Sequence, residues 1–143
     1  MKLSWEDNDN NIDWHEASTL YKIAPMGDKR PQDIKQAFGN SLYKCFVFEQ
    51  TQLVGIGRAL ADGVDCSYLC DIAVHPDYQG HGIGKGIIEN LTELSKGHKK
   101  IILYAVPGKE AFYKKFGFKR MSTAMAIFKD HNNAINIGLI NET

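Results

Sequence analysis

The spacing of hydrophobic residues changes along the chain, and each spacing predicts a different element. Alternation in 42–50 and 52–62, on either side of a short turn, predicts an antiparallel hairpin. The segment 64–74 continues as a third strand. In 82–97 the apolar residues fall on one helical face, which predicts the clearest helix of the chain. We expect Gly97 to cap its C-terminal end.

The N-terminal part predicts one strand and two helices. Residues 2–5 have the pattern of a short strand, and 14–24 have a helical pattern. Asp13 is placed to cap that helix, and Glu16 would complete an approximate capping box. A second helix is expected over 30–41, where proline stands near the start and glycine near the end.

Three further elements are expected in the C-terminal part. The segment 99–106 is a continuous apolar strand, 108–118 is a short helix, and 122–130 is a final strand. In the tail, 129–143, apolar residues alternate, which predicts a strand or a segment that covers a second subunit in a homodimer. A loosely docked end is the alternative.

The order of these elements predicts the fold class. A strand–helix–strand crossover in the middle joins two parallel strands, whereas hairpins make the rest of the sheet antiparallel. The length of 143 residues fits one domain. The sequence therefore predicts an α/β (α+β) fold, with a single domain over 1–143, a mixed, mostly antiparallel central sheet and helices on both faces.

Charge and composition narrow the function. Lys plus Arg number 17, as do Asp plus Glu, so no long-range field favours nucleic acid or an anionic membrane as partner. No run has the composition of a signal peptide or the roughly 20 apolar residues of a membrane span, so we expect a cytoplasmic protein. Five scattered histidines and the spacing of the cysteines predict reduced thiols and no metal site. The cysteines are Cys45, Cys66 and Cys70.

Four glycines alternate in "QGHGIGKG", residues 79–86, between a strand and a helix. Such a turn suits a phosphate, because free N–H groups and the helix dipole face it. A dinucleotide fingerprint fails, since Lys85 and Ile87 stand where the third glycine is required. A P-loop fails as well, since Gln79 and Gly86 stand where glycine and Ser or Thr are required.

The pattern that does fit is Q/R-x-x-G-x-G/A, formed by Gln79, Gly82 and Gly84 directly after "DIAVHPDY". At this point the chain resembles the GCN5-related N-acetyltransferase family, which transfers an acetyl group from acetyl-CoA to an amine. The segment "AFYKKFGF", residues 111–118, is similar to the family's C-terminal "FYxxxGF" motif. These segments look most like glucosamine-phosphate and plant or cyanobacterial arylalkylamine (serotonin-type) acetyltransferases, two likenesses that disagree about the substrate.

The resemblance implies where acetyl-CoA, the acetyl donor, binds. Backbone amides of 79–85 would cradle its pyrophosphate, and strand residues 71–74 would pair with its pantetheine arm and polarise the thioester carbonyl. Lys85 could add a charge-assisted contact. Pro107 and Gly108 stand where the family often has an asparagine. The residues expected at the acetyl-CoA site are Ile72, Ala73, Val74, Gln79, Gly80, His81, Gly82, Ile83, Gly84, Lys85 and Phe112.

The resemblance also implies catalytic roles. Tyr113 occupies the position of the family's usual proton donor for the departing thiolate. Asp71 and Tyr68 are the candidate bases for the acceptor amine, which is protonated at neutral pH. Alternation along a strand points positions 68 and 71 to opposite faces unless a bulge intervenes. We favour Asp71, which could equally hold the ammonium group without acting as the base.

We expect an acetyl-CoA-dependent N-acetyltransferase that acts on a primary amine of a small molecule. In this reading 1–41 form the acceptor side, 42–128 the acetyl-CoA-binding core and 129–143 a tail. A non-catalytic acyl-CoA sensor or partner subunit, and an enzyme that acetylates peptide or protein amines, are the alternatives. The candidate acceptor-binding residues are Met26, Gly27 and Arg30.

Overall fold

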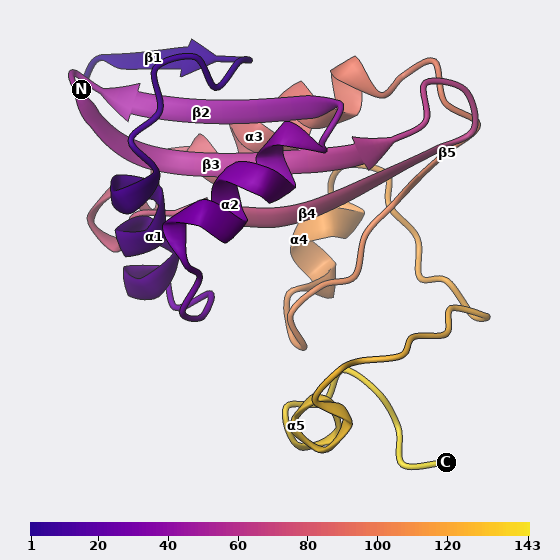
Figure 1. Ribbon diagram of the computed structural model, residues 1–143. Coiled ribbons are helices and arrows are strands. Elements are labelled where there is room, and N and C mark those ends of the chain that lie inside the picture. The colour runs from indigo at the N-terminus through magenta and orange to yellow at the C-terminus, as the bar shows by residue number, and fades with distance from the viewer. The chain divides into compact units, whose positions relative to one another are not determined.

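The computed structural model describes residues 1–143, which divide into two compact units, Met1–Leu103 and Tyr104–Thr143. The first unit holds a five-stranded sheet, three α-helices and one turn of 3-10 helix, and the second holds two short α-helices (Figure 1). In chain order, the elements of the first unit are β1 (Leu3–Glu6), α1 (Trp14–Ile23), α2 (Pro31–Gly39), β2 (Tyr43–Glu49), β3 (Gln52–Ala61), β4 (Cys66–Val74), the 3-10 turn η1 (Pro76–Tyr78), α3 (Ile83–Leu94) and β5 (Lys100–Ile102). Those of the second unit are α4 (Glu110–Lys114) and α5 (His131–Asn136).

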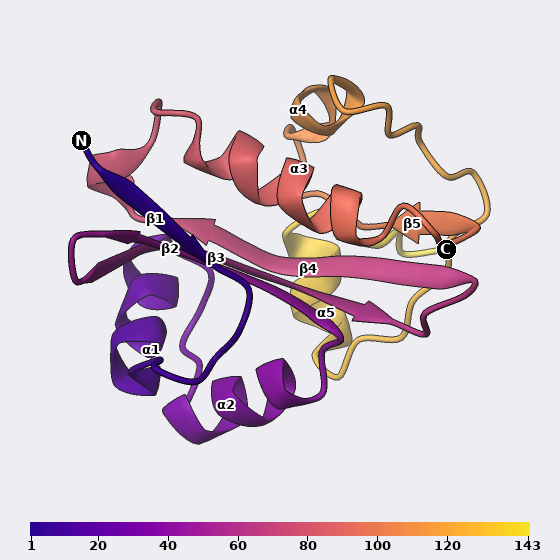
Figure 2. The ribbon, with the colours of Figure 1, turned by 90° about the horizontal axis from the view of Figure 1, so that it is seen from above.

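The strand order in the sheet is β1-β2-β3-β4-β5. The first three neighbouring pairs are antiparallel, and β4 and β5 are parallel. Helices α1 and α2 cover one face of the sheet, and α3, which connects β4 to β5, covers the other (Figure 2). The predicted fold class, a mixed and mostly antiparallel sheet with one parallel crossover and helices on both faces, is confirmed.

Helix α3 lies close to the sheet because two glycines of β3 face it. A Cβ atom at Gly55 would come within 2.8 Å of Ile83 Cγ2, and one at Gly57 within 2.8 Å of Ile87 Cγ2. Contacts this short do not occur between real side chains, so the helix packs at a depth that only glycine allows. On this face α3 buries Ile83, Ile87, Ile88 and Leu91.

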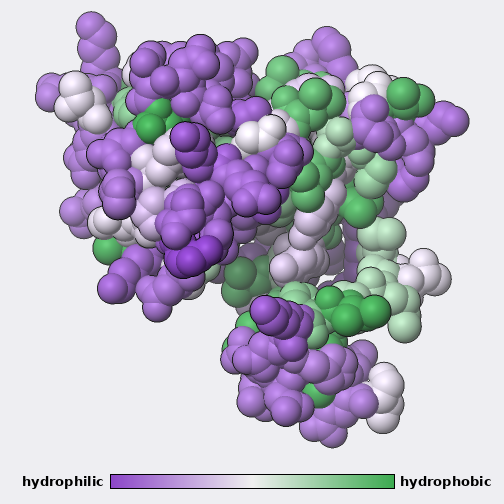
Figure 3. Space-filling model, in the orientation of Figure 1, coloured by the Kyte–Doolittle hydropathy of each residue, from purple (hydrophilic) through white to green (hydrophobic).

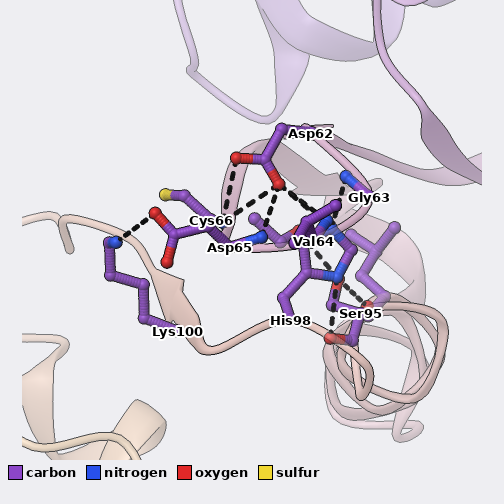
Figure 4. Close-up of polar contacts among 10 residues, drawn as sticks. Asp62, Gly63, Val64, Asp65, Cys66, Ser95, His98 and Lys100 are labelled. Atoms are coloured by element: carbon purple, nitrogen blue, oxygen red, sulfur yellow. Dashed lines mark hydrogen bonds and ion pairs between the residues drawn. The ribbon is translucent and has the colours of Figure 1, made fainter.

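Polar contacts join β5 to the turn between β3 and β4 (Figure 4). Lys100 forms an ion pair with Asp65 at 2.8 Å, and its backbone N–H donates to the carbonyl of Asp65. In the same turn, the Asp62 carboxylate accepts hydrogen bonds from three backbone N–H groups, which hold its pKa below the ordinary value. The three donors belong to Asp65, Val64 and Cys66.

The ring of His98 ties this turn to the end of α3. Its Nε2 accepts a hydrogen bond from the backbone N–H of Gly63 at 2.9 Å, so Nδ1 carries the proton and donates to the carbonyl of Ser95. The side chain of His98 is almost fully buried. The turn, the end of α3 and the start of β5 therefore form one polar cluster, which holds β4 and β5 together at this end of the sheet.

Three local expectations in the first unit are wrong. Strand β5 is only three residues long instead of spanning 99–106. Glu16 does not complete a capping box, because its carboxylate accepts from the backbone N–H of Leu53 at 3.0 Å and so ties α1 to β3. Helix α3 ends before Gly97, where the Ser95 hydroxyl donates to a carbonyl of the last turn.

The second unit also differs from expectation at two places. The segment 122–130 does not form a strand, and its Met125 and Ile127 are 94% and 99% exposed. Alternation predicts a strand on the assumption that a neighbouring strand pairs with it, and none does here. In the tail, Asp130 caps helix α5 by accepting from the N–H of Asn133, so this part is helical. No helix of the chain combines the length and apolar character needed to cross a membrane.

The close packing of α3 on β3 predicts the effect of a single methyl group. The substitution Gly57→Ala overpacks this interface and should lower the free energy of unfolding by about 1–3 kcal/mol. Gly39→Ala is the matched control, because a Cβ at that helical position meets no atom within 4 Å. It should be neutral or stabilise by up to about 1 kcal/mol. Urea unfolding measures both variants, and equal stability of the two would contradict the packing described for α3.

Candidate active site

Strand β4 carries one extra residue where it passes β3. Arg58 pairs with Cys70, but Ile56, two residues earlier on β3, pairs with Ala73, three residues later on β4. Asp71 lies in this bulge with a φ of +56°. The extra residue shifts the alternation of side chains, so that the Asp71 carboxylate turns to the face of α1 and α2, where it meets Arg58.

Both candidate bases therefore lie on one face of the sheet. Tyr68 pairs with Leu60, which shares a face with Arg58 because the two stand two residues apart on β3. Strict alternation would have separated Tyr68 from Asp71, and the bulge removes that separation. The face they share is the one that α1 and α2 cover.

A buried tyrosine of α1 holds the bulge. The hydroxyl of Tyr21 donates to the backbone carbonyl of Asp71 at 2.7 Å. Burial, and next to it the charge of Asp71, raises the pKa of Tyr21 well above its ordinary value. The hydroxyl therefore keeps its proton and remains a donor to this carbonyl.

The Asp71 carboxylate binds two cations. Oδ2 accepts a hydrogen bond from Arg58 Nε at 2.9 Å, and Oδ1 lies 3.6 Å from Lys29 Nζ. Arg58 also donates to the hydroxyl of Ser41 at 3.2 Å and lies over the ring of Phe38. Its guanidinium is thus fixed on three sides, whereas Lys29 reaches Asp71 from the loop between α1 and α2.

These residues line a pocket of about 330 Å³ between the two N-terminal helices and the sheet. The surface over α1 and α2 is mainly hydrophilic (Figure 3). Tyr21, Ile34 and Phe38 also line the pocket. Its charged residues are three carboxylates, Asp28, Asp33 and Asp71, and three cations, Lys29, Arg30 and Arg58.

Of the predicted acceptor-binding residues, only Arg30 lines this pocket. Its guanidinium makes two hydrogen bonds to Asp33, each at 3.0 Å, and is therefore already paired. Met26 is partly buried and packs against the core, and Gly27 lies in the loop with a φ of +99°. Sequence reasoning missed Lys29, Tyr21 and Arg58.

One signal for this pocket was present in the sequence. Arg58 is the only charged residue of β3 and Asp71 the only one of β4. Two opposite charges, each alone in an apolar strand, predict a buried ion pair if the strands are neighbours. Nothing in the sequence marks Lys29 among the other lysines.

The glycine loop leads into α3 without a side-chain cap. Gly80 and Gly82 have φ values of +82° and +79°, and a Cβ at either would meet no atom within 4 Å. Gly82 is the N-cap of α3, and no side chain accepts from the first N–H groups of the helix. The N–H groups of residues 83–85 have no acceptor within the helix, so they remain open to an anion.

The side chains of the loop differ in burial and in their contacts. Ile83 is buried against the sheet, so only its backbone is available to a ligand. His81 and Gln79 are exposed, and Gln79 Nε2 donates weakly to the carbonyl of Val74 at 3.4 Å. Lys85 lies 3.8 Å from Glu89 one turn further along α3. The loop residues predicted to bind acetyl-CoA therefore all lie at or next to the uncapped N-terminus of α3.

Next to this loop, one edge of β4 is open. The parallel pairing with β5 covers only three residues and ends where Tyr68 faces Ile102. Beyond that point β4 pairs with β3 alone: Ala73 pairs with Ile56 and Val74 with Gly55, and 71–72 form the bulge. The two parallel strands are thus joined at the polar cluster, and their pairing ends before the bulge, which leaves backbone N–H and C=O groups of β4 without a strand partner on that side.

The predicted proton donor lies in the second unit. Tyr113 belongs to α4, and its ring centroid lies 5.2 Å from that of Phe112 and 6.2 Å from that of Phe118. Burial raises the pKa of Tyr113, so the phenol is protonated through the neutral range. Helix α4 is shorter than the helix expected over 108–118, which we expected to end at Gly117: it ends at Lys114, and Gly117 lies beyond it with a φ of +92°.

All three cysteines are free. Burial raises the pKa of the Cys45 thiol to about 12 and that of Cys70 to about 11. Both are therefore thiols rather than thiolates at neutral pH, and neither is an activated nucleophile.

Residues 41–120 match the family model described as the acetyltransferase (GNAT) domain. The uncharacterized N-acetyltransferase ycf52 of Porphyra purpurea is 37% identical over 124 residues, which cover 82% of this chain and 71% of that protein. The ycf52-like N-acetyltransferase of Prochlorococcus marinus is 34% identical, over 63% of this chain and 54% of that protein. The chain thus spans little more than half of the latter relative.

Two further proteins bear on the resemblances in the motifs. Serotonin N-acetyltransferase 2, chloroplastic, of Oryza sativa subsp. japonica is 39% identical over 46% of this chain and 34% of that protein. The glucosamine-6-phosphate N-acetyltransferase of Arabidopsis thaliana has a TM-score of 0.69 and 16% identity, over 91% of this chain and 100% of that chain, so the likeness is one of fold alone.

A probable acetyltransferase of meticillin-resistant Staphylococcus aureus, SA2161, has a TM-score of 0.78 and 25% identity, over 89% of this chain and 99% of that chain. The family model covers more than half of the 143 residues and includes the glycine loop and the bulged strand. The chain belongs to the GCN5-related N-acetyltransferase (GNAT) family.

Proposed function

We propose that this protein transfers an acetyl group from acetyl-CoA to a primary amine of a small molecule. The observation that carries the proposal is the open, bulged edge of β4 beside the uncapped start of α3. Acetyl-CoA supplies the acetyl group as a thioester. A pyrophosphate needs free N–H groups and space for its oxygens, and the loop at Gly80 and Gly82 offers both.

In this proposal, backbone groups bind acetyl-CoA and polarise its thioester carbonyl. The N–H groups of 83–85 hold the pyrophosphate, with the dipole of α3 favouring its negative charge. The open edge of β4 at 71–74 pairs with the amide groups of the pantetheine arm, as an added strand would. An N–H of the same edge donates to the thioester oxygen and stabilises the charge that develops there.

The pocket on the α1 and α2 side receives the acceptor. The Asp71 carboxylate is placed to hold an ammonium group, and its position in the bulge puts it beside the backbone edge that binds the thioester. Asp71, with Tyr68 on the same face, is the candidate base that takes the ammonium proton before attack. A pocket of about 330 Å³ lined by charged side chains suits a small polar molecule.

The last step is assigned to Tyr113. The leaving thiolate needs a proton, and a phenol whose pKa is raised by burial holds one throughout the neutral range. Because burial raises the pKa of Tyr113, deprotonation of this phenol should not limit the rate in the neutral range.

The loop assignment predicts a selective loss of CoA binding. Gly82→Ala places a Cβ where the pyrophosphate would lie and should raise the Kd for CoA at least about tenfold, a loss near 1.4 kcal/mol. Gly63→Ala is the matched control, since Gly63 has a φ of +86° and is equally open. Both variants should lose about 1–2 kcal/mol of stability from the left-handed backbone. Calorimetric titration with CoA measures the Kd of each variant. Equal affinities of Gly82→Ala and Gly63→Ala for CoA would contradict the loop assignment.

The acid assignment predicts a loss of turnover without a loss of CoA binding. Tyr113→Phe should lower kcat about a hundredfold or more, because the thiolate then leaves without a positioned proton. Turnover is measured as release of free thiol from acetyl-CoA. The acceptors tested are serotonin, glucosamine 6-phosphate, polyamines, amino acids and short peptides. Tyr43→Phe, which removes a hydroxyl from β2, is the control. Undiminished turnover in Tyr113→Phe would remove the assigned acid, and no thiol release by the wild type with any amine would refute the proposed function.

A further inference from the structure

The ammonium group of Lys29 occupies a cation site inside the candidate acceptor pocket. Its Nζ lies 3.6 Å from Asp71 Oδ1 and 5.4 Å from the centroid of the Tyr21 ring. A carboxylate beside an aromatic face is the arrangement that binds ammonium groups in proteins. The side chain of Lys29 is only 31% exposed, so its charged end is held in the pocket rather than in solvent.

The other cations of the pocket are held more firmly. Arg58 donates to Asp71 Oδ2 and to Ser41, and Arg30 makes two hydrogen bonds to Asp33. The side chain of Lys29 makes the ion pair with Asp71 and the contact with the Tyr21 ring, and both distances are longer than the hydrogen bonds of the two arginines. Of the three cations, Lys29 is therefore the one that a competing ammonium group displaces at least cost.

The backbone of Lys29 is anchored by a hydrogen bond, whereas its side chain makes the weaker contacts described above. The hydroxyl of Ser18 on α1 donates to the carbonyl of Lys29 at 2.5 Å. The loop therefore stays in place when the side chain leaves. A lysine side chain has four rotatable bonds, so it can swing from the pocket into solvent without any movement of α1 or α2.

We propose that the acceptor's ammonium group binds where Lys29 Nζ lies, between Asp71 and the ring of Tyr21, and that Lys29 competes with the acceptor for this place. The inference rests on the proposed function in that it takes this pocket as the acceptor site. It also restricts the acceptor class. The site is filled by an amine at the end of an unbranched alkyl arm, which favours alkylamines and arylalkylamines over amino sugars, whose nitrogen is attached to a ring carbon.

The direct probe is n-butylammonium chloride, because it reproduces the lysine side chain from Cβ outward. NMR titration without acetyl-CoA compares the wild type, Lys29→Ala and the control Lys22→Ala, which removes an exposed lysine of α1. From the usual strength of a partly exposed ion pair and a cation–π contact, Lys29→Ala should bind the probe about tenfold more tightly. Lys22→Ala should bind it as the wild type does. Adding Asp71→Asn to Lys29→Ala should abolish the gain in affinity for the probe. The uncharged analogue n-butanol should bind Lys29→Ala no more tightly than it binds the wild type.

Turnover supplies a second readout. With serotonin as acceptor, Lys29→Ala should lower KM by about the same tenfold factor with a much smaller change in kcat, because a competitor for the ground state has been removed. Equal affinity of wild type and Lys29→Ala for n-butylammonium, or tight binding that survives Asp71→Asn, would overturn the inference. Failure of the proposed function is a different result: no acetyl transfer to any amine, whatever the titration shows.

Discussion

The hydrogen bond from the Tyr21 hydroxyl to the backbone carbonyl of Asp71 holds the feature on which the candidate site depends. Without the extra residue at this point, Asp71 would continue the alternation of Leu69 and face α3. That face is filled by apolar side chains, and an unpaired carboxylate there would cost several kcal/mol. The bulge instead turns the carboxylate toward Arg58, Lys29 and the pocket.

The same strand is held at one end and open at the other. The polar cluster around Asp62, Asp65 and His98 joins β4 to the start of β5, and their pairing lasts for three residues. Helix α3 packs deep on the sheet over Gly55 and Gly57. The uncapped helix start and the open strand edge thus belong to one unit, and this combination supports the proposed binding of a nucleotide head and an extended arm.

The fold class could be predicted because its signals are local. The alternation of 42–50 and 52–62, the helical face of 82–97 and the glycine spacing each depend on neighbours in sequence, and the sheet follows from their order. The strand expected over 122–130 failed for the opposite reason: alternation carries no information on whether a partner strand exists. Glu16 shows a similar limit, because its tertiary contact with Leu53 replaced the local cap.

The candidate site could be predicted in its backbone parts and less well in its side chains. Gln79, Gly82 and Gly84 follow a spacing that phosphate binding explains, whereas Gly86 has another role: a Cβ there would overlap the ring of Trp5. The bulge that joins Tyr68 and Asp71 on one face depends on the register of two strands. The position of Lys29 depends on the path of the loop between α1 and α2. Neither is encoded in a short motif.

We propose that one CoA molecule binds along the open edge of β4 and at the start of α3. Backbone amide NMR of the uniformly ¹⁵N-labelled protein, recorded with and without CoA, tests it most directly. We expect the largest shifts on saturation at residues 82–85 and 72–74, with little change in β1 and β2. Saturable binding whose shifts leave both of these segments unchanged, or the absence of binding at millimolar CoA, would contradict it.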